Sequence, residues 1–115
     1  MPAGNYNIIC DQGSTFTRVL TWKNSNGTAV DLTNYTARMQ VRTNYASSTT
    51  LLSLTTENGG ITLGGVAGTI TITATATATA AIAADTYVYD LEMLTGANVT
   101  RLVEGTFQVT PEVTR

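Results

Sequence analysis

Alternation of apolar and polar residues is the dominant pattern of this chain. It is clearest from Thr86 to Leu94, where one face carries the large apolar side chains of Tyr87, Tyr89, Leu91 and Met93. A period of two with the bulky groups on one side is typical of a half-buried antiparallel strand. The segment Thr36–Arg42 repeats the pattern, with Ala37, Met39 and Val41 on its apolar face. Both segments are therefore predicted to cover a core on one side and to face water on the other.

Shorter alternating runs, separated by turn signals such as Asn-Gly and Gly-Gly, occupy most of the remaining sequence. The further predicted strands are Tyr6–Cys10, Ser14–Lys23, Leu51–Thr55, Ile61–Leu63, Thr69–Thr73, Val99–Glu104 and Thr106–Thr110. Gly105 is expected to mark a β-bulge between the last two, and Pro111 to end ladder pairing. The pattern predicts an all-β fold: a single domain over residues 1–115, built as an antiparallel β-sandwich of about eight strands.

The Ala-Thr dipeptides from Ala74 to Ala81 continue the alternation beyond the usual length of a strand. Because alanine packs poorly in strands and favours helices, we expect the strand to break near Thr75. A single helical turn around Thr77–Ala81 then forms the crossover between the sheets. Thr69–Ala76 carries neither charge nor proline, so we expect it to be covered by a partner subunit or to lie inside a sheet.

Two aromatic residues are predicted to be structural. The spacing Ile82-x-x-Asp85-x-Tyr87 resembles the corner of immunoglobulin-like sandwiches, where a tyrosine hydroxyl bonds back across the turn. Trp22, the only tryptophan, follows Phe16 and Leu20 on one face, with Arg18 as the one polar exception. A core position beside the Tyr87 strand is the economical place for it, and an exposed sugar-stacking platform is the alternative.

The inventory of reactive side chains is small. Histidine is absent and Cys10 is the only cysteine, so zinc sites, a Ser-His-Asp triad and an intrachain disulfide are excluded. Asp85, Asp90 and Glu92 lack the spacing of a calcium loop and are interpreted as part of a solvated strand face. Composition does not exclude a glycosidase pair among the carboxylates, but no spacing recommends one. We expect no catalytic residue, metal or cofactor, hence no enzyme.

Charge and hydropathy limit the partners. A net charge of −2 with scattered arginines argues against nucleic acid. No segment approaches the ~20 apolar residues of a membrane span, and residues 1–6 lack the pattern of a signal peptide. The chain is therefore expected to be made in the cytoplasm. The polar segment Thr43–Thr50 is predicted to be a surface loop with Tyr45 at its tip.

Several short sequence motifs, in their order along the chain, resemble those of small virion proteins of tailed bacteriophages, in particular the immunoglobulin-like N-terminal domain of the phage baseplate upper protein. The motifs are Asp11-Gln-Gly-Ser-Thr, Asn26-Gly, Val30-Asp-Leu-Thr, Gly68-Thr-Ile-Thr, Tyr87-Val-Tyr-Asp-Leu-Glu and Gly105-Thr-Phe-Gln-Val-Thr-Pro. In that family further segments follow this domain, whereas this sequence ends at Arg115, which leaves open a decoration or adaptor subunit.

The resemblance implies a structural protein of the virion that docks in symmetric copies on other virion proteins of a tail, baseplate, neck or capsid. The candidate contact residues are Tyr35, Tyr45, Arg38 and Arg42. The alternative is a carbohydrate- or host-surface-binding module, in which Tyr35, Tyr45 and polar loop groups form the site.

Overall fold

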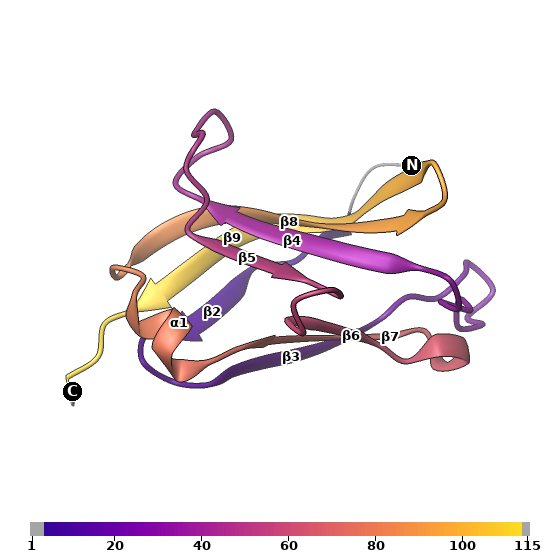
Figure 1. Ribbon diagram of the computed structural model, residues 1–115, viewed down its shortest axis with the longest axis horizontal. Helices are drawn as coiled ribbons and strands as arrows, with labels where there is room; N and C mark the ends of the chain where they lie inside the picture. Colours follow the sequence, from indigo (N-terminus) through magenta and orange to yellow (C-terminus); the bar gives the residue numbers. More distant parts are fainter. Residues whose placement is uncertain (1–3, 114–115) are drawn as a thin grey trace.

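The computed structural model describes residues 4–113, which form two packed sheets joined by one short helix (Figure 1). The larger sheet contains β1 (Gly4–Asn5), β2 (Ile8–Asp11), β4 (Thr36–Arg42), β5 (Leu52–Thr55), β8 (Asp85–Thr95) and β9 (Asn98–Thr110). The smaller sheet contains β3 (Phe16–Thr21), β6 (Ile61–Leu63) and β7 (Thr69–Ala74). The predicted all-β sandwich is confirmed. Residues 1–3, on which part of the signal-peptide prediction rests, lie outside the described residues.

The larger sheet has the order β1-β9-β8-β4-β5, with β2 also pairing with β9. All its pairs are antiparallel except those of β1 and β2, which run parallel to β9. The first predicted strand, Tyr6–Cys10, corresponds to β2, which begins at Ile8, and β1 is a separate short strand before it. Both have a parallel partner at the far end of the sequence. Alternation in β2 indicates which side chains are buried, but it does not specify the partner strand or its direction.

The core lies between the facing sides of the two sheets. Tyr87, Tyr89, Leu91 and Met93 of β8 are buried, as the alternation predicts, and so are the three apolar residues of β4. From the smaller sheet Ile70 and Ile72 of β7 face them, fully buried. An edge-to-face contact of Phe107 with Phe16 connects the two sheets, with ring centroids 5.6 Å apart, and Tyr89 packs on Phe107 within the larger sheet at 6.4 Å.

The predicted tyrosine corner is present. The Tyr87 hydroxyl donates a hydrogen bond of 2.6 Å to the carbonyl oxygen of Ala83, four residues earlier in the turn that leads into β8. Burial of the ring, together with the nearby Asp85, raises the pKa of this phenol. The bond fixes the entry of the chain into the strand that pairs with both β4 and β9.

Replacing Tyr87 by phenylalanine is expected to lower the free energy of unfolding by about 1 kcal/mol, because the ring stays buried while this one hydrogen bond is lost. Urea denaturation followed by circular dichroism measures the change. Tyr45→Phe removes a hydroxyl from a side chain that is 69% exposed and is the matched control, for which we expect no change. Equal stabilities of the two variants would contradict a stabilising corner.

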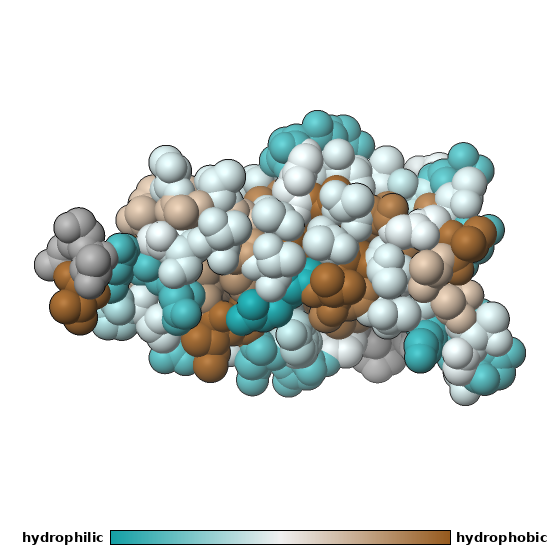
Figure 2. Space-filling view, turned by 90° about the horizontal axis from the view of Figure 1, so that it is seen from below, coloured by the Kyte–Doolittle hydropathy of each residue, from teal (hydrophilic) through white to brown (hydrophobic). Residues whose placement is uncertain are grey.

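The threonine-rich strand β7 is the middle strand of the smaller sheet, between β3 and β6. Of the two alternatives for this segment, the interior position is therefore the one observed, and β7 needs no partner subunit. Two of its outward threonines pair with threonines of β3, in the register Thr17↔Thr73 and Thr21↔Thr69, and Thr71 lies opposite Val19. Figure 2, which views the molecule from the side of this sheet, shows many pale residues of intermediate hydropathy, with separate brown and teal patches.

The crossover from β7 to β8 contains the expected helical turn. The helix α1 spans Ala76–Ala80, and the Thr75 hydroxyl caps it by accepting a hydrogen bond from the backbone N–H of Ala78. Thr79 of this helix is fully buried, and its hydroxyl is bonded to the chain that leads into β3. The short helix is thereby attached to the sheet it has just left.

The predicted bulge at Gly105 is wrong. Gly105 pairs regularly with Tyr89 within one long strand, β9, and the register shift lies opposite Leu91 and Glu92, where Leu102 is the extra residue. A Cβ atom on Gly105 would lie 2.6 Å from the carbonyl oxygen of Tyr6. The glycine is therefore required for close approach of the N-terminal backbone, and not for a bulge.

Two residues of the predicted strand Ser14–Lys23 do not lie in the centre of the core, although they alternate with its buried residues. Arg18 lies at the open side of the sandwich, where its guanidinium group stacks 4.8 Å from the Phe16 ring centroid and donates a 2.7 Å hydrogen bond to the Ile9 carbonyl oxygen. Trp22 is half-buried at the periphery of the core and packs edge-to-face on Tyr35, at 5.8 Å between centroids. Trp22 is thus in contact with the residue before β4, and not at the centre of the core.

Candidate functional site

The outer face of the larger sheet carries paired charges. In the register between β4 and β8, Arg38 lies opposite Glu92 and Gln40 opposite Asp90. Arg38 Nε and Glu92 Oε1 are 2.7 Å apart. The face that the sequence predicts to be solvated is therefore occupied by ion pairs and hydrogen bonds between neighbouring strands.

The bulge at Leu102 adds two further charges to this face. In a regular strand Arg101 and Glu104, three positions apart, would point to opposite sides. The extra residue shifts the alternation, so that both side chains lie on the outer face. Arg101 then approaches Asp90 at 3.4 Å and Glu104 at 3.7 Å. Arg101 was missed by the sequence analysis because the bulge was placed at Gly105.

The β4–β5 loop, residues 43–51, stands over one end of this face and projects from the sandwich (Figure 1). Arg42, the last residue of β4, holds the loop by donating a 2.6 Å hydrogen bond to the Ser47 carbonyl oxygen. Its other terminal nitrogen donates to Gln40 Oε1 at 2.8 Å. Within the loop the Asn44 side chain accepts from the backbone N–H of Ala46. These bonds position Tyr45, whose side chain remains 69% exposed.

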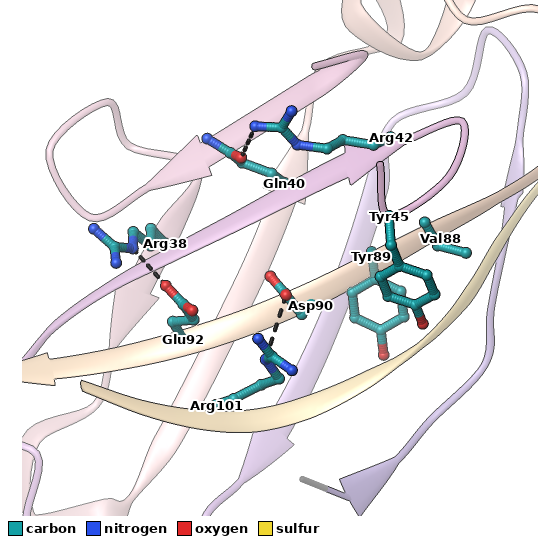
Figure 3. Close-up of a pocket in the computed structure, with 9 residues that line it drawn as sticks. All are labelled: Arg38, Gln40, Arg42, Tyr45, Val88, Tyr89, Asp90, Glu92 and Arg101. Atoms are coloured by element: carbon teal, nitrogen blue, oxygen red, sulfur yellow. Dashed lines mark hydrogen bonds and ion pairs between the residues drawn. The ribbon is translucent and has the colours of Figure 1, made fainter. Parts of the chain in front are cut away.

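Tyr45 borders two open hollows. One, of about 470 Å³, lies over β4 and β8 and is lined by charged and polar groups together with Val88 (Figure 3). The other, of about 520 Å³, lies towards β1 and β9 and is lined by polar side chains that include Asn5, Asn7 and Glu104. An exposed phenol between two hollows offers a flat apolar surface with hydrogen-bonding groups on either side.

The structure brings together three of the four candidate contact residues. Arg38, Arg42 and Tyr45 all line the hollow over β4 and β8. Tyr35 does not, because it lies just before β4, at the opposite end of that strand, and packs on Trp22. Tyr89, which is buried in the core, also lines the hollow and was not assigned to a site. The other residues that sequence reasoning did not assign to a site are Gln40, Val88, Asp90, Glu92 and Arg101. Their alternation with buried neighbours was visible, but their partners depend on strand order.

Asp90 is the carboxylate of this face whose pKa is raised above its ordinary value. Desolvation is the largest cause, and the negative charges of Glu92 and Glu104 add to it, while Arg101 and Arg38 act in the opposite direction. The folded protein therefore retains the Asp90 proton to a higher pH than the unfolded chain does. By linkage, the ionisation of Asp90 makes folding less favourable as pH rises from the ordinary pKa through the raised one.

Replacing Asp90 by asparagine, which resembles the protonated acid, should leave stability unchanged at pH values below the ordinary pKa of aspartate. As pH rises through the raised pKa, the variant should become progressively more stable than the unmodified protein, and the difference should then stay constant. Chemical denaturation at a series of pH values measures this difference. Asp31, whose pKa is lowered by hydrogen bonds from Thr33, provides a control of opposite sign. A pH-independent difference for Asp90→Asn would contradict the desolvation argument.

The outer face of the larger sheet carries groups that form hydrogen bonds and ion pairs. Its carboxylates are engaged with arginines, and the remaining groups that line the hollow are Arg42, one amide, two phenols and a valine. Among residues 4–113, no three acidic or cysteine side chains gather as a metal ion requires. Cys10 is buried on the inner side of β2, where desolvation raises the pKa of its thiol. Neither the helix α1 nor the 3-10 turn at Gly65–Ala67, the helical segments of residues 4–113, is long and apolar enough to cross a membrane.

Comparisons with known proteins gave no match, either to a protein-family model or to a curated protein.

Proposed function

We propose that the chain is a non-enzymatic structural subunit of a tailed-phage particle. It acts as an adaptor of a tail, baseplate or neck, or as a decoration subunit of a capsid, and it docks on other virion proteins in symmetric copies. The support comes from the order of the sequence motifs that resemble the N-terminal domain of the baseplate upper protein. The two-sheet sandwich with a tyrosine corner is compatible with that resemblance.

The observation that carries the docking proposal is the exposed Tyr45 on a hydrogen-bonded loop beside a face of paired charges. Aromatic and arginine side chains dominate the energetics of protein interfaces, and an anchor that is already positioned loses little entropy on binding. Tyr45 would be the anchor, with Arg38 and Arg42 beside it. A stable contact buries ~800 Å² per partner, and repeated contacts on one particle add avidity.

Incorporation into particles tests this proposal. In a phage deleted for the coding region, complementation with the unmodified gene should restore the protein to purified particles, as seen by immunoblot and cryo-electron microscopy. Tyr45→Ala should reduce incorporation at least tenfold, which corresponds to the loss of about 1.4 kcal/mol of binding free energy. Val66→Ala, at a side chain 74% exposed on the turn between β6 and β7, is the matched control and should incorporate normally.

Intact, fully infectious particles without the protein would overturn the structural role. Normal incorporation of Tyr45→Ala would overturn the placement of the docking site while leaving the role itself in place. The two parts of the proposal therefore fail separately.

A carbohydrate- or host-surface-binding module is the second candidate, favoured by the hollow of about 470 Å³ beside Tyr45 and its hydrogen-bonding side chains. Tyrosine rings stack on sugar faces, and arginine, glutamine and aspartate bond to sugar hydroxyl groups. Under this reading the isolated protein should bind purified host envelopes, and Tyr45→Ala should abolish binding while Val66→Ala leaves it intact. Absence of binding at high protein concentration would eliminate this candidate.

A further inference from the structure

Strand β3 forms an edge of the smaller sheet, with β7 on one side and no described strand on the other. The backbone N–H of Trp22, just past β3, donates to the Gly68 carbonyl oxygen of the chain that leads into β7. Backbone groups alternate in direction along an antiparallel ladder. Those of Phe16, Arg18 and Leu20 therefore point towards β7, and those of Thr17, Val19 and Thr21 point outwards.

Other edges of the described chain are short or interrupted. Strands β5 and β6 have four and three residues, against six in β3. Near the β8–β9 hairpin, the part of β9 that does not pair with β1 or β2 is interrupted by the bulge at Leu102. In β2 the Ile9 carbonyl oxygen already accepts a hydrogen bond from Arg18. These are the means by which natural proteins prevent edge-to-edge pairing. In β3 the only such device is Arg18, whose Nη1 covers the Thr17 carbonyl at 2.9 Å. The rest of the strand contains no proline, lysine or bulge.

The sequence of β3 is complementary to itself. If a second copy runs antiparallel with Val19 opposite its own equivalent, Thr17 lies opposite Thr21 of the second copy, and Arg18 lies opposite Leu20. The outward-pointing backbone groups of Thr17, Val19 and Thr21 then all find hydrogen-bond partners on the second copy. In any shifted register that places these residues opposite one another, at least one of them lies beyond the end of the partner strand. Like charges do not lie directly opposite one another, and the threonine pairs repeat those between β3 and β7.

We propose that β3 is a homotypic contact: two copies of this chain pair through β3, antiparallel and centred on Val19, so that their smaller sheets join into one. Val19 is 60% exposed, although it is an apolar residue in the middle of the strand. The Thr17 carbonyl accepts a 2.9 Å hydrogen bond from Arg18 Nη1, and its second lone pair remains available for the partner. The outward residues of β3 and β7 are threonines and Val19, so the joined face contains no opposed charges along these strands.

The proposed dimer does not depend on the proposed function or on the presence of a phage particle, because it is inferred from the open edge and the sequence of β3 alone. An edge of six residues buries less than the ~800 Å² per partner of a standard interface, so we expect a reversible dimer of modest affinity in solution. On a particle that presents many copies, the same contact would gain through multivalency.

Cysteine pairing tests the register. Residues opposite one another in a hydrogen-bonded antiparallel pair have Cα atoms about 5.5 Å apart, within the range of a disulfide. Val19→Cys should therefore form a covalent dimer under mild oxidation, at least tenfold faster than Val66→Cys, the exposed control. Thr17→Cys alone should not dimerise, because its equivalent would be four residues away along the strand, but Thr17→Cys mixed with Thr21→Cys should give the heterodimer. Cys10 is buried and stays in place.

Sedimentation velocity over a wide concentration series gives the second readout. The unmodified protein should show reversible dimerisation, Val19→Lys should be monomeric at every concentration, and Val19→Thr should dimerise. Thermal unfolding should confirm that these exposed substitutions leave the fold intact. An unmodified protein that is monomeric throughout, or equal oxidation rates for Val19→Cys and Val66→Cys, would overturn the proposal. Efficient dimerisation of Thr17→Cys by itself would overturn the Val19-centred register.

Discussion

Replacing Gly105 with alanine is expected to lower the free energy of unfolding by roughly 2–3 kcal/mol, the cost of forcing a side chain into a packed site. The new Cβ would lie 2.6 Å from the Tyr6 carbonyl oxygen and 2.8 Å from Asn7 Oδ1. The Tyr6 peptide cannot retreat freely, because its N–H donates to the Glu104 carbonyl at 2.9 Å and its carbonyl accepts from the Tyr89 hydroxyl.

The expected damage is localised. Because Tyr6 connects β1 to β2, its displacement should loosen the parallel pairing of both strands with β9. Denaturant titration measures the loss, and hydrogen exchange should show faster exchange in residues 4–11 than elsewhere. Gly4→Ala is the matched control in the same pair of strands, where the nearest atom to the new Cβ is 3.5 Å away. If both alanine variants were equally stable, close approach would not be the reason for glycine at position 105.

Thr79→Val should lower the free energy of unfolding by about 2 kcal/mol although it preserves shape, because it leaves polar groups without partners. The fully buried Thr79 hydroxyl donates to the Ser14 carbonyl oxygen at 2.8 Å and accepts from the Gly13 N–H at 3.1 Å. Valine can do neither. The substitution therefore separates the helix α1 from the turn that precedes β3.

Thr79→Ser restores the hydroxyl without the methyl group and is expected to recover most of the loss. The same denaturation experiment compares the three proteins. A serine variant as unstable as the valine variant would indicate that the methyl group, and not the hydrogen bonds, stabilises this position.

Local patterning predicted much of the fold. The bounds of β4 and the buried faces of β4 and β8 were correct because alternation over seven or more residues specifies both the strand and its inner side. The Thr75 break was correct because propensity and capping chemistry agree there. The prediction of a bulge at Gly105 was wrong because glycine is required there by the close approach of Tyr6, about a hundred residues away in the sequence.

The candidate site was predicted less completely. Arg38 and Arg42 were grouped correctly, since they lie on one face of one strand. Tyr35 was grouped with Tyr45 by residue type, yet the length of β4 separates them. Arg101 and Asp90 meet only because β8 and β9 are neighbours and a bulge shifts the alternation. Such contacts depend on strand order and register, which local patterns do not contain.

The parallel pairing of β2 with β9 has a mechanical consequence. The chain enters this pair at the start of β2 and leaves it at the end of β9, so tension applied through the flanking residues pulls the two strands past each other lengthwise. The hydrogen bonds of a pair loaded in this way share the force and must break together, whereas a hairpin pulled from one end opens bond by bond. We therefore expect the domain to resist stretching along its ends far better than its modest size suggests, and forced unfolding of single molecules would measure that resistance.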